Sequence, residues 1–374
     1  NNLTFKTEGD FTNNVEQTVA NKMIISANNI VNNVNAKLSA HDTTLNSNTL
    51  TNRGLIDGHK ALINSTRVIN IGTGRIYGDH LAFSVNTVEN LAEILNGETK
   101  AGTIAARSRL DFGVDKLINR DHALILSLDK LFIGDKLDAN NQATGQASLV
   151  DNGSATIEAL GDGAIHTVRL LNHDLYIKTG IKTDKQYLKE YTPEKSSDIY
   201  LGKGGENAQG YLDWNNNNRR DRNAYFRFSN GTSVGSPTWF QKFYTRTTNT
   251  ATLDHQDPAK ISIGGNLSLS GEKLTNESSR FLIGKQLLLG DQIFDSNPNN
   301  LNLITSSTKL ENIDLMGEIH RLDQGETSTL ISKRVRHGIR GRRVWAHYIE
   351  NINKNFSRTL PVETFGFKLV LNTI

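Results

Sequence analysis

Residues 50–70 read LTNRGLIDGHKALINSTRVIN and span one period of a short repeat. The same signature opens and closes this period: an apolar residue, any residue and then an asparagine, ending at Asn52 and again at Asn70. Two further apolar runs, around Ile56 and at Leu62-Ile63, lie between the signatures and are separated by Gly, Asp and Asn. Because such small and polar residues favour turns, the period predicts three short strands joined by turns.

The signature recurs along the chain. It ends at the following positions: Asn13, Asn32, Asn52, Asn70, Asn90 and Asn119, and later Asn276, Asp295 and Asn312. Successive ends lie 17 to 20 residues apart within each group, except for one interval of 29 residues that contains an extra loop around Gly97. No segment carries apolar residues at helical spacing over three turns, so the repeat predicts strands and not helices.

A unit of this length cannot bury its own apolar face, but stacking on a copy of itself achieves this, because equivalent strands then pair in parallel. The sequence therefore predicts an all-β protein, a right-handed parallel β-helix (a solenoid) of about a dozen turns. Asparagine tolerates left-handed turns, and its amides can bond from turn to turn as a ladder. We expect the ladder to contain Asn13, Asn32, Asn52, Asn70, Asn90, Asn119, Asn276 and Asn312.

The composition excludes several classes of protein. The chain has 374 residues, a net charge of +3, 42 asparagines, 31 glycines and no cysteine. Disulfide scaffolds, thiolate zinc sites and cysteine nucleophiles are therefore excluded. No apolar run reaches the length of a membrane-spanning helix, so we expect no transmembrane segment. The sequence starts at Asn1 without a signal peptide, and we expect it to be a piece of a longer protein.

The repeat fades after Leu137 and is restored at Ile261. Between these points the chain becomes rich in Tyr, Phe and Trp, which predicts an inserted β-hairpin module that protrudes from one turn. We expect four segments: repeat turns at 1–180, the insertion at 181–258, resumed turns at 259–316 and a basic C-terminal segment at 317–374. Trp214, Trp239 and Tyr244 are candidate ligand contacts; the alternative is that these aromatics form the core of the module.

The C-terminal segment has a strongly basic stretch. Between Thr327 and Ile349 there are six Lys or Arg residues and no Asp or Glu that could neutralise them. A hairpin turn is predicted near residue 340, and the segment either caps the helix or lies close to a receptor. Such a basic ribbon could bind lipopolysaccharide phosphate or an acidic glycan, although many charge runs are only solvated faces. Nucleic acid is not expected, because the whole chain is nearly neutral. The candidate ligand contacts here are Arg340, Arg342, Arg343 and Trp345.

Motifs for catalysis are absent from the sequence. The candidate carboxylates fall mostly at turn positions, where Asp is ordinary: Asp57, Asp79, Asp111, Asp115, Asp129 and Asp135. There is no Gly-x-Ser-x-Gly elbow, His-Glu-x-x-His motif or phosphate-binding loop. His41 and His59 occupy equivalent places in consecutive turns, but a solvated column is the more frequent outcome than a metal site. We therefore predict no catalytic residue, no metal and no cofactor.

The repeat resembles the filamentous haemagglutinin repeat of large two-partner-secreted exoproteins of Gram-negative bacteria. Residues 263–276, IGGNLSLSGEKLTN, and the early turn at 50–56 carry this resemblance. The return from the insertion at 244–261 is similar to the exit from the insertion that interrupts such helices. The arginine-rich stretch 339–347 resembles the region after the last turns in contact-dependent growth inhibition exoproteins.

This resemblance implies a secreted, non-enzymatic segment of a bacterial cell-surface filament. Such a rod is exported unfolded through an outer-membrane partner and projects a receptor-binding and toxin-delivery region toward neighbouring bacteria. Its partner would be an outer-membrane receptor or a surface glycan of the target cell. A host-cell adhesin would share every turn of the rod, and a polysaccharide-degrading β-helix enzyme is a further alternative that would need clustered carboxylates.

Overall fold

The computed structural model describes residues 1–204, 207–214, 221–290, 308–336 and 342–367, which form strands and turns without a helix. The chain divides into two units. Unit 1 comprises Asn1–Lys178 and His255–Leu315, and unit 2 comprises Thr179–Asp254 and Met316–Lys368. Within the described residues, each unit is therefore assembled from two separate stretches of sequence.

Unit 1 contains these strands: β1 (Asn2–Lys6), β2 (Phe11–Asn13), β3 (Glu16–Ser26), β4 (Asn29–Asn32), β5 (Lys37–Asn52), β6 (Leu55–Ile71), β7 (Arg75–Leu95), β8 (Glu98–Ala101), β9 (Thr103–Arg120), β10 (Leu124–Ser127), β11 (Lys130–Gly134), β12 (Lys136–Leu137), β13 (Ala143–Thr144), β14 (Ala147–Gly153), β15 (Thr156–Ala159), β16 (Gly163–His173), β23 (Lys260–Ile263), β24 (Leu267–Ser270), β25 (Lys273–Glu277), β26 (Arg280–Ile283), β27 (Leu287–Leu289) and β28 (Leu310–Ile313). All but β12 and β13 belong to one 20-stranded sheet.

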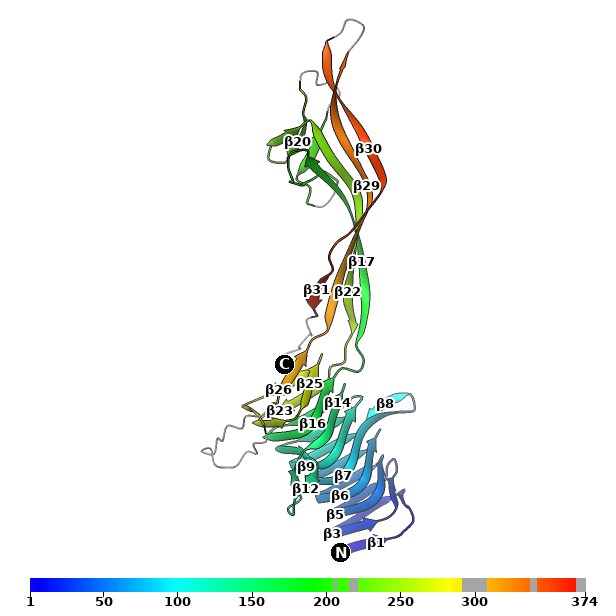
Figure 1. Cartoon of the computed structure of the whole chain (residues 1–374). Helices are drawn as coiled ribbons and strands as arrows, with labels where there is room; N and C mark the ends of the chain where they lie inside the picture. Colours follow the sequence, from blue (N-terminus) through cyan, green and yellow to red (C-terminus); the bar gives the residue numbers. More distant parts are fainter. Residues whose placement is uncertain (205–206, 215–220, 291–307, 337–341, 368–374) are drawn as a thin grey trace. The chain divides into compact units, whose positions relative to one another are not determined.

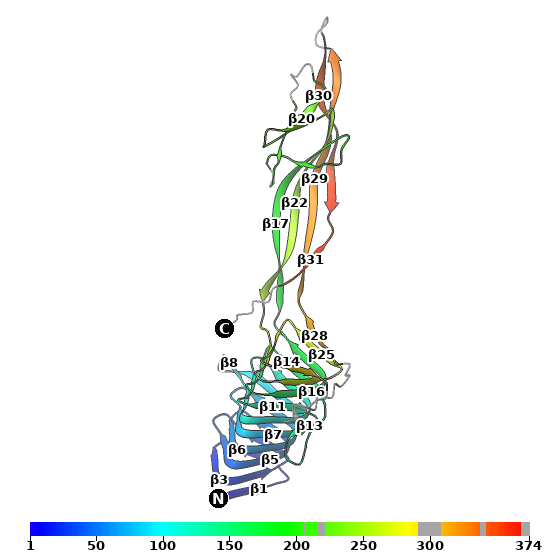
Figure 2. The same ribbon diagram turned by 90° about the vertical axis from the view of Figure 1, so that its left-hand side faces the viewer.

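Parallel pairing between successive repeats builds this sheet. β5 pairs with β6, β6 with β7 and β7 with β9, and the register places Asn52 beside Asn70 and Asn70 beside Asn90. Figures 1 and 2 show these strands stacked one above another. The loop around Gly97 is a hairpin in which β8 runs antiparallel to β7. One sequence repeat is thus one layer of the stack.

Three columns of apolar side chains fill the interior of unit 1. The first column contains Leu38, Ile56, Ile76, Ile104, Ile125, Ile157 and Ile261. The second contains Leu45, Ile63, Phe83, Phe112, Ile133, Ile165 and Leu269. The third contains Leu50, Val68, Val88, Leu117, Val150, Leu170 and Leu274. All are at most 2% exposed. Because burying one such side chain contributes about 1.5–3 kcal/mol, these columns are the main stabilising feature of the unit.

Stacking continues across the position where unit 2 is inserted. β16 pairs with β14 on one side and with β24 and β25 on the other. Asn172 and Asn276 are neighbours in this register although 104 residues separate them in sequence. The fading of the period after Leu137 therefore reflects irregular connections, because the stacked strands continue through β14, β15 and β16.

Unit 2 contains these strands: β17 (Lys178–Pro193), β18 (Tyr200–Leu201), β19 (Gly210–Asp213), β20 (Ala224–Phe228), β21 (Ser233–Ser236), β22 (Thr238–His255), β29 (Met316–Arg336), β30 (Arg343–Thr359) and β31 (Glu363–Gly366). Six of them form a sheet in the order β18-β17-β22-β29-β30, with β31 also paired to β29, and β19, β20 and β21 form a smaller antiparallel sheet. Figure 1 shows β17, β22, β29 and β30 as long, twisted strands.

The insertion and the basic C-terminal segment of the sequence meet within unit 2. β22 pairs antiparallel with β29 from Thr238, opposite Ile331, to Thr250, opposite Ile319. The hairpin extends well beyond the basic stretch 327–349, because β29 and β30 remain paired from Leu322, opposite Thr359, to Arg336, opposite Arg343. The structure therefore joins 181–258 and 317–374 in one sheet, whereas the sequence predicts two separate segments.

Candidate functional site

An asparagine ladder runs through unit 1. Each amide Nδ2 donates a hydrogen bond of 2.7–2.9 Å to the Oδ1 of the next member. The members in order are Asn13, Asn32, Asn52, Asn70, Asn90, Asn119, Asn152, Asn172, Asn276 and Asn312. The structure thus places all eight asparagines expected for the ladder in one column and adds Asn152 and Asn172 to them. Both additions carry the apolar-any-Asn signature, so the sequence contained the signal, and only the irregular spacing hid it.

The aromatic residues of the insertion lie mostly in the core of unit 2. Trp239 is fully buried, and its indole N–H donates to the carbonyls of Ala224 and Ser236 at 3.1 Å. Tyr244 is 2% exposed. Trp239 and Tyr244 are therefore core residues and not the ligand contacts proposed from the sequence, because the protein covers their aromatic rings. Trp214 is 37% exposed and remains accessible.

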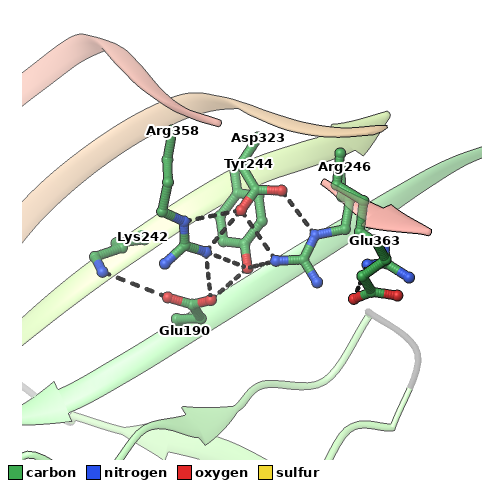
Figure 3. Close-up of polar contacts among 8 residues, drawn as sticks. Glu190, Lys242, Tyr244, Arg246, Asp323, Arg358 and Glu363 are labelled. Atoms are coloured by element: carbon green, nitrogen blue, oxygen red, sulfur yellow. Dashed lines mark hydrogen bonds and ion pairs between the residues drawn. The ribbon is translucent and has the colours of Figure 1, made fainter. Parts of the chain in front are cut away.

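A buried ion-pair network joins four strands of unit 2 (Figure 3). Asp323 on β29 accepts hydrogen bonds from Arg246 on β22 (2.7 Å) and from Arg358 on β30 (2.6 Å). Glu190 on β17 accepts hydrogen bonds from Arg358 (3.0 Å) and from the hydroxyl of Tyr244. The Asp323 side chain is fully buried. Because each carboxylate is held by donors from other strands, the network links the side chains of β17, β22, β29 and β30.

The pKa values of the network follow from these contacts. Burial alone would raise the pKa of Asp323, but the hydrogen bonds from Arg246 and Arg358 outweigh it and hold the pKa below its ordinary value. Against the same effect of burial, the donors Tyr244 and Arg358 hold the pKa of Glu190 below its ordinary value. Burial and the bond to Glu190 raise the pKa of Tyr244 far above its usual range. At neutral pH both carboxylates are ionised and paired, which is the state of a structural network.

Arginines gather on one face of the β29–β30 hairpin. Arg334 lies directly opposite Trp345, and Arg336 lies directly opposite Arg343. Residues opposite one another in an antiparallel pair project to the same face, as do residues two apart on one strand. All four side chains therefore share a face, and the three arginines on it are exposed.

A fourth arginine joins this face from the insertion. Ser332 lies two residues before Arg334, and its hydroxyl donates to the carbonyl of Arg222. The guanidinium of Arg222 lies 5.3 Å from the ring centre of Trp345. We call the following residues the arginine face: Arg222, Arg334, Arg336, Arg343 and Trp345.

The acidic residues near the hairpin are engaged elsewhere. Lys333 and Glu350 form an ion pair, and Lys333 projects to the side opposite Arg334 because the two are adjacent on the strand. Asp221 accepts hydrogen bonds from the hydroxyl of Tyr225 and from the backbone N–H of Asn223. Among the described residues, no carboxylate forms an ion pair with an arginine of the arginine face. This arrangement is suited to binding an anion.

The structure places the ligand contacts predicted in the basic segment differently from one another. Arg343 and Trp345 belong to the arginine face, Arg342 is exposed beside it, and Arg340 lies outside the described residues. Arg334 and Arg336 were visible in sequence as part of a basic run, although not as members of one face. Arg222 had no sequence signal, because only the fold brings the insertion beside the hairpin.

The net charge of +3 conceals an uneven distribution between the units. Unit 2 has 21 Lys or Arg and 13 Asp or Glu, which gives +8, whereas the other residues have 21 and 26, which gives −5. Unit 2 is therefore the basic part of the chain. Its charge favours anionic partners.

The histidines and carboxylates of unit 1 pair with one another and with arginines. The rings of His41 and His59 lie 4.6 Å apart, and His59 Nδ1 is 2.5 Å from Asp79. Arg107 contacts Asp79 at 2.7 Å and Asp57 at 3.4 Å. The hydrogen bonds from Arg107 and His59 hold the pKa of Asp79 below its ordinary value. Within the described ranges, no three His, Asp or Glu side chains gather closely enough to hold a metal ion.

The described part of the chain has no helix of the length and apolar character needed to cross a membrane.

Comparisons with known proteins give no relative for this chain. No family model, no curated protein and no solved structure matches the sequence or the fold.

Proposed function

We propose that this chain is a non-enzymatic segment of a secreted bacterial cell-surface filament of the filamentous haemagglutinin type, most like the stalk of a contact-dependent growth inhibition effector. In this proposal unit 1 is a right-handed parallel β-helix that acts as a stiff stalk. Unit 2 contacts a receptor or surface glycan on a neighbouring bacterium. The full-length protein would pass through an outer-membrane partner and deliver a toxin.

The observation that carries this proposal is the asparagine ladder, which passes from Asn172 to Asn276 at 2.7 Å although unit 2 is inserted between them. Each turn of unit 1 pairs its backbone, its apolar columns and its asparagine with the next turn. Repeats of this kind stabilise one another through nearest-neighbour contacts. The interior of unit 1 is filled by buried side chains that contact the neighbouring repeats, which supports the role of a stalk.

The pairing of the buried acids supports a non-enzymatic role. Asp111 is fully buried and bonds to His80 (2.9 Å) and Arg109 (2.6 Å). Asp151 bonds to Arg120 and to His173 (2.9 Å). Burial would raise the pKa of either carboxyl, but these donors hold both pKa values below their ordinary value. An acid held ionised by basic partners is poorly suited to donate a proton.

Binding to intact cells tests the proposal. Fluorescently labelled chain should bind Gram-negative cells. The matched variant joins residue 178 to residue 255 through a Gly-Ser linker and ends at residue 315, because β22 and β29 must be removed together. We expect this variant to keep a β-rich circular dichroism spectrum and a cooperative melt, and to lose cell binding.

Two results would count against the proposal. Equal binding by the variant would place recognition outside unit 2. Binding to cultured epithelial cells but not to bacteria would favour the alternative function, a host-cell adhesin, since such a protein would share the same stalk.

A further inference from the structure

We infer that the arginine face binds a glycan that carries phosphate or sulfate groups. This inference rests on the proposed function, in which unit 2 meets the surface of another cell, and it names the chemistry of the ligand. Phosphorylated saccharide on a bacterium and sulfated saccharide on an animal cell share this chemistry, and the experiment below separates these two sources.

Charge is segregated between the two faces of the β29–β30 hairpin. Lys333 projects away from the arginine face and is neutralised by Glu350. Its neighbour Arg334 and the next residue on that face, Arg336, are exposed and have no carboxylate partner among the described residues. Arginine binds phosphate and sulfate through two parallel N–H donors, so unpaired arginines on one face make a suitable anion site.

Arg336 and Arg343 lie directly opposite one another on the paired strands. Like charges directly opposite one another in an antiparallel pair are destabilising. A pair of this kind costs stability in the free protein, and a bound dianion between the two guanidinium groups would reverse that cost. The positions thus fit a ligand better than they fit the fold.

The arginine face also contains an aromatic side chain. Trp345 is partly exposed, lies directly opposite Arg334 and is contacted by Arg222 at 5.3 Å. An aromatic ring beside cationic donors offers an apolar surface for the C–H face of a sugar next to groups that hold its charge. This combination favours an anionic saccharide over a simple inorganic anion.

The experiment compares two changes on the same strand. Binding of the full chain to rough-type lipopolysaccharide, to heparin and to neutral dextran is measured by biolayer interferometry. We expect binding to one or both anionic glycans and none to dextran. The double variant Arg334→Ser/Arg336→Ser should bind at least about tenfold more weakly, because a hydrogen bond to a charged group is strong. The matched control Lys333→Ser should bind as the unchanged chain does. Raised salt should weaken binding by screening.

A second measurement distinguishes a loss of binding from a folding defect. Arg336→Thr removes the like-charge pair, so its melting temperature should rise while its affinity for glycan falls. An arginine with a merely structural role would show the reverse. The inference is overturned if neither anionic glycan binds, or if Lys333→Ser weakens binding as much as the double variant.

The two proposals fail in different ways. If the double variant still binds bacterial cells as the unchanged chain does, the glycan inference is wrong and the receptor-binding role of unit 2 stands. If the unchanged chain binds heparin but neither lipopolysaccharide nor bacterial cells, the arginine face is an anionic-glycan site and the bacterial target is wrong.

Discussion

An internal asparagine of the ladder uses its whole side chain. Asn70 accepts from Asn52 through Oδ1, donates to Asn90 at 2.8 Å and donates its second amide proton to the carbonyl of Thr103 at 3.2 Å. Aspartate has the same shape but only accepts, and alanine makes none of these bonds. Asparagine therefore suits this position because its amide both donates and accepts hydrogen bonds, and not only because it tolerates turn conformations.

Substitution of Asn70 should be costly. Asn70→Ala leaves one amide proton of Asn52 Nδ2 and the Oδ1 of Asn90 without an acceptor or donor in a buried site, and each buried unpaired group costs about 1–3 kcal/mol. We expect a loss of about 2–5 kcal/mol in the unfolding free energy of unit 1, measured by urea denaturation. The control Asn64→Ala removes a bond to Asn46 that is only partly buried. Equal losses for both variants would contradict the special role of the ladder.

The ion-pair network predicts the acid sensitivity of unit 2. The pKa values of Asp323 and Glu190 lie below their ordinary values in the folded state. Each therefore contributes stability that is fully present above the ordinary carboxyl pKa of about 4 and is lost as the pH falls below it. The tryptophan fluorescence transition should be constant from neutral pH to about pH 5 and then shift to lower urea concentration.

A substitution checks the origin of this sensitivity. Asp323→Asn breaks a buried pair and should cost unit 2 about 3–5 kcal/mol, with a smaller further loss in acid. The control Glu363→Gln removes an exposed partner of Arg321 and should change stability by no more than about 1 kcal/mol. An unchanged acid transition in Asp323→Asn would show that other groups cause it.

At the scale of the strand, a column of small residues accompanies the ladder. In each repeat a small residue lies directly before the strand that carries the first apolar column. These residues are Ala36, Gly54, Gly74, Gly102, Ala123, Ala155, Ala259 and Ser279. A Cβ at Gly74 would lie 2.4 Å from the carbonyl oxygen of Asn52 and 2.5 Å from Oδ1 of Asn70. The turn therefore passes close to the ladder, and only small side chains fit there.

A bulky residue in this column should disturb the stacking. Gly74→Leu must displace either the backbone or the amide of Asn70, so we expect a loss of about 1–3 kcal/mol or more from overpacking. In the control Gly9→Leu the new Cβ meets only Oγ1 of Thr7 at 3.6 Å, an ordinary contact. Urea denaturation of both variants measures the difference, and a similar loss at Gly9 would rule out the steric explanation.

The sequence predicts the strands that recur in every repeat, but it does not predict strand pairings that occur only once. The strands around Asn52 and Asn70 recur with nearly constant spacing, so parallel stacking follows from the period. The antiparallel pairing of Thr238 with Ile331 has no period, and its partners are far apart in the sequence. The basic hairpin was visible as a charge run containing Arg343, whereas Arg222 entered the site only through the fold.

At the scale of the whole molecule, each unit has its own source of stability, so the two should unfold separately. The three tryptophans, Trp214, Trp239 and Trp345, all lie in unit 2, so tryptophan fluorescence reports on that unit alone. Far-ultraviolet circular dichroism reports on both. We expect the two probes to give transitions that do not coincide, since coincidence is the mark of a two-state protein.

The two buried networks allow this separation to be tested by mutation. Asn70→Ala weakens only the ladder and should shift the circular dichroism transition of unit 1, leaving the fluorescence transition in place. Asp323→Asn weakens only the sheet of unit 2 and should shift the fluorescence transition. Because the ladder joins Asn172 directly to Asn276, the loss of unit 2 interrupts no bond of the ladder. If either variant shifted both transitions equally, the chain would be one cooperative unit, and unit 2 could not be removed without destabilising unit 1.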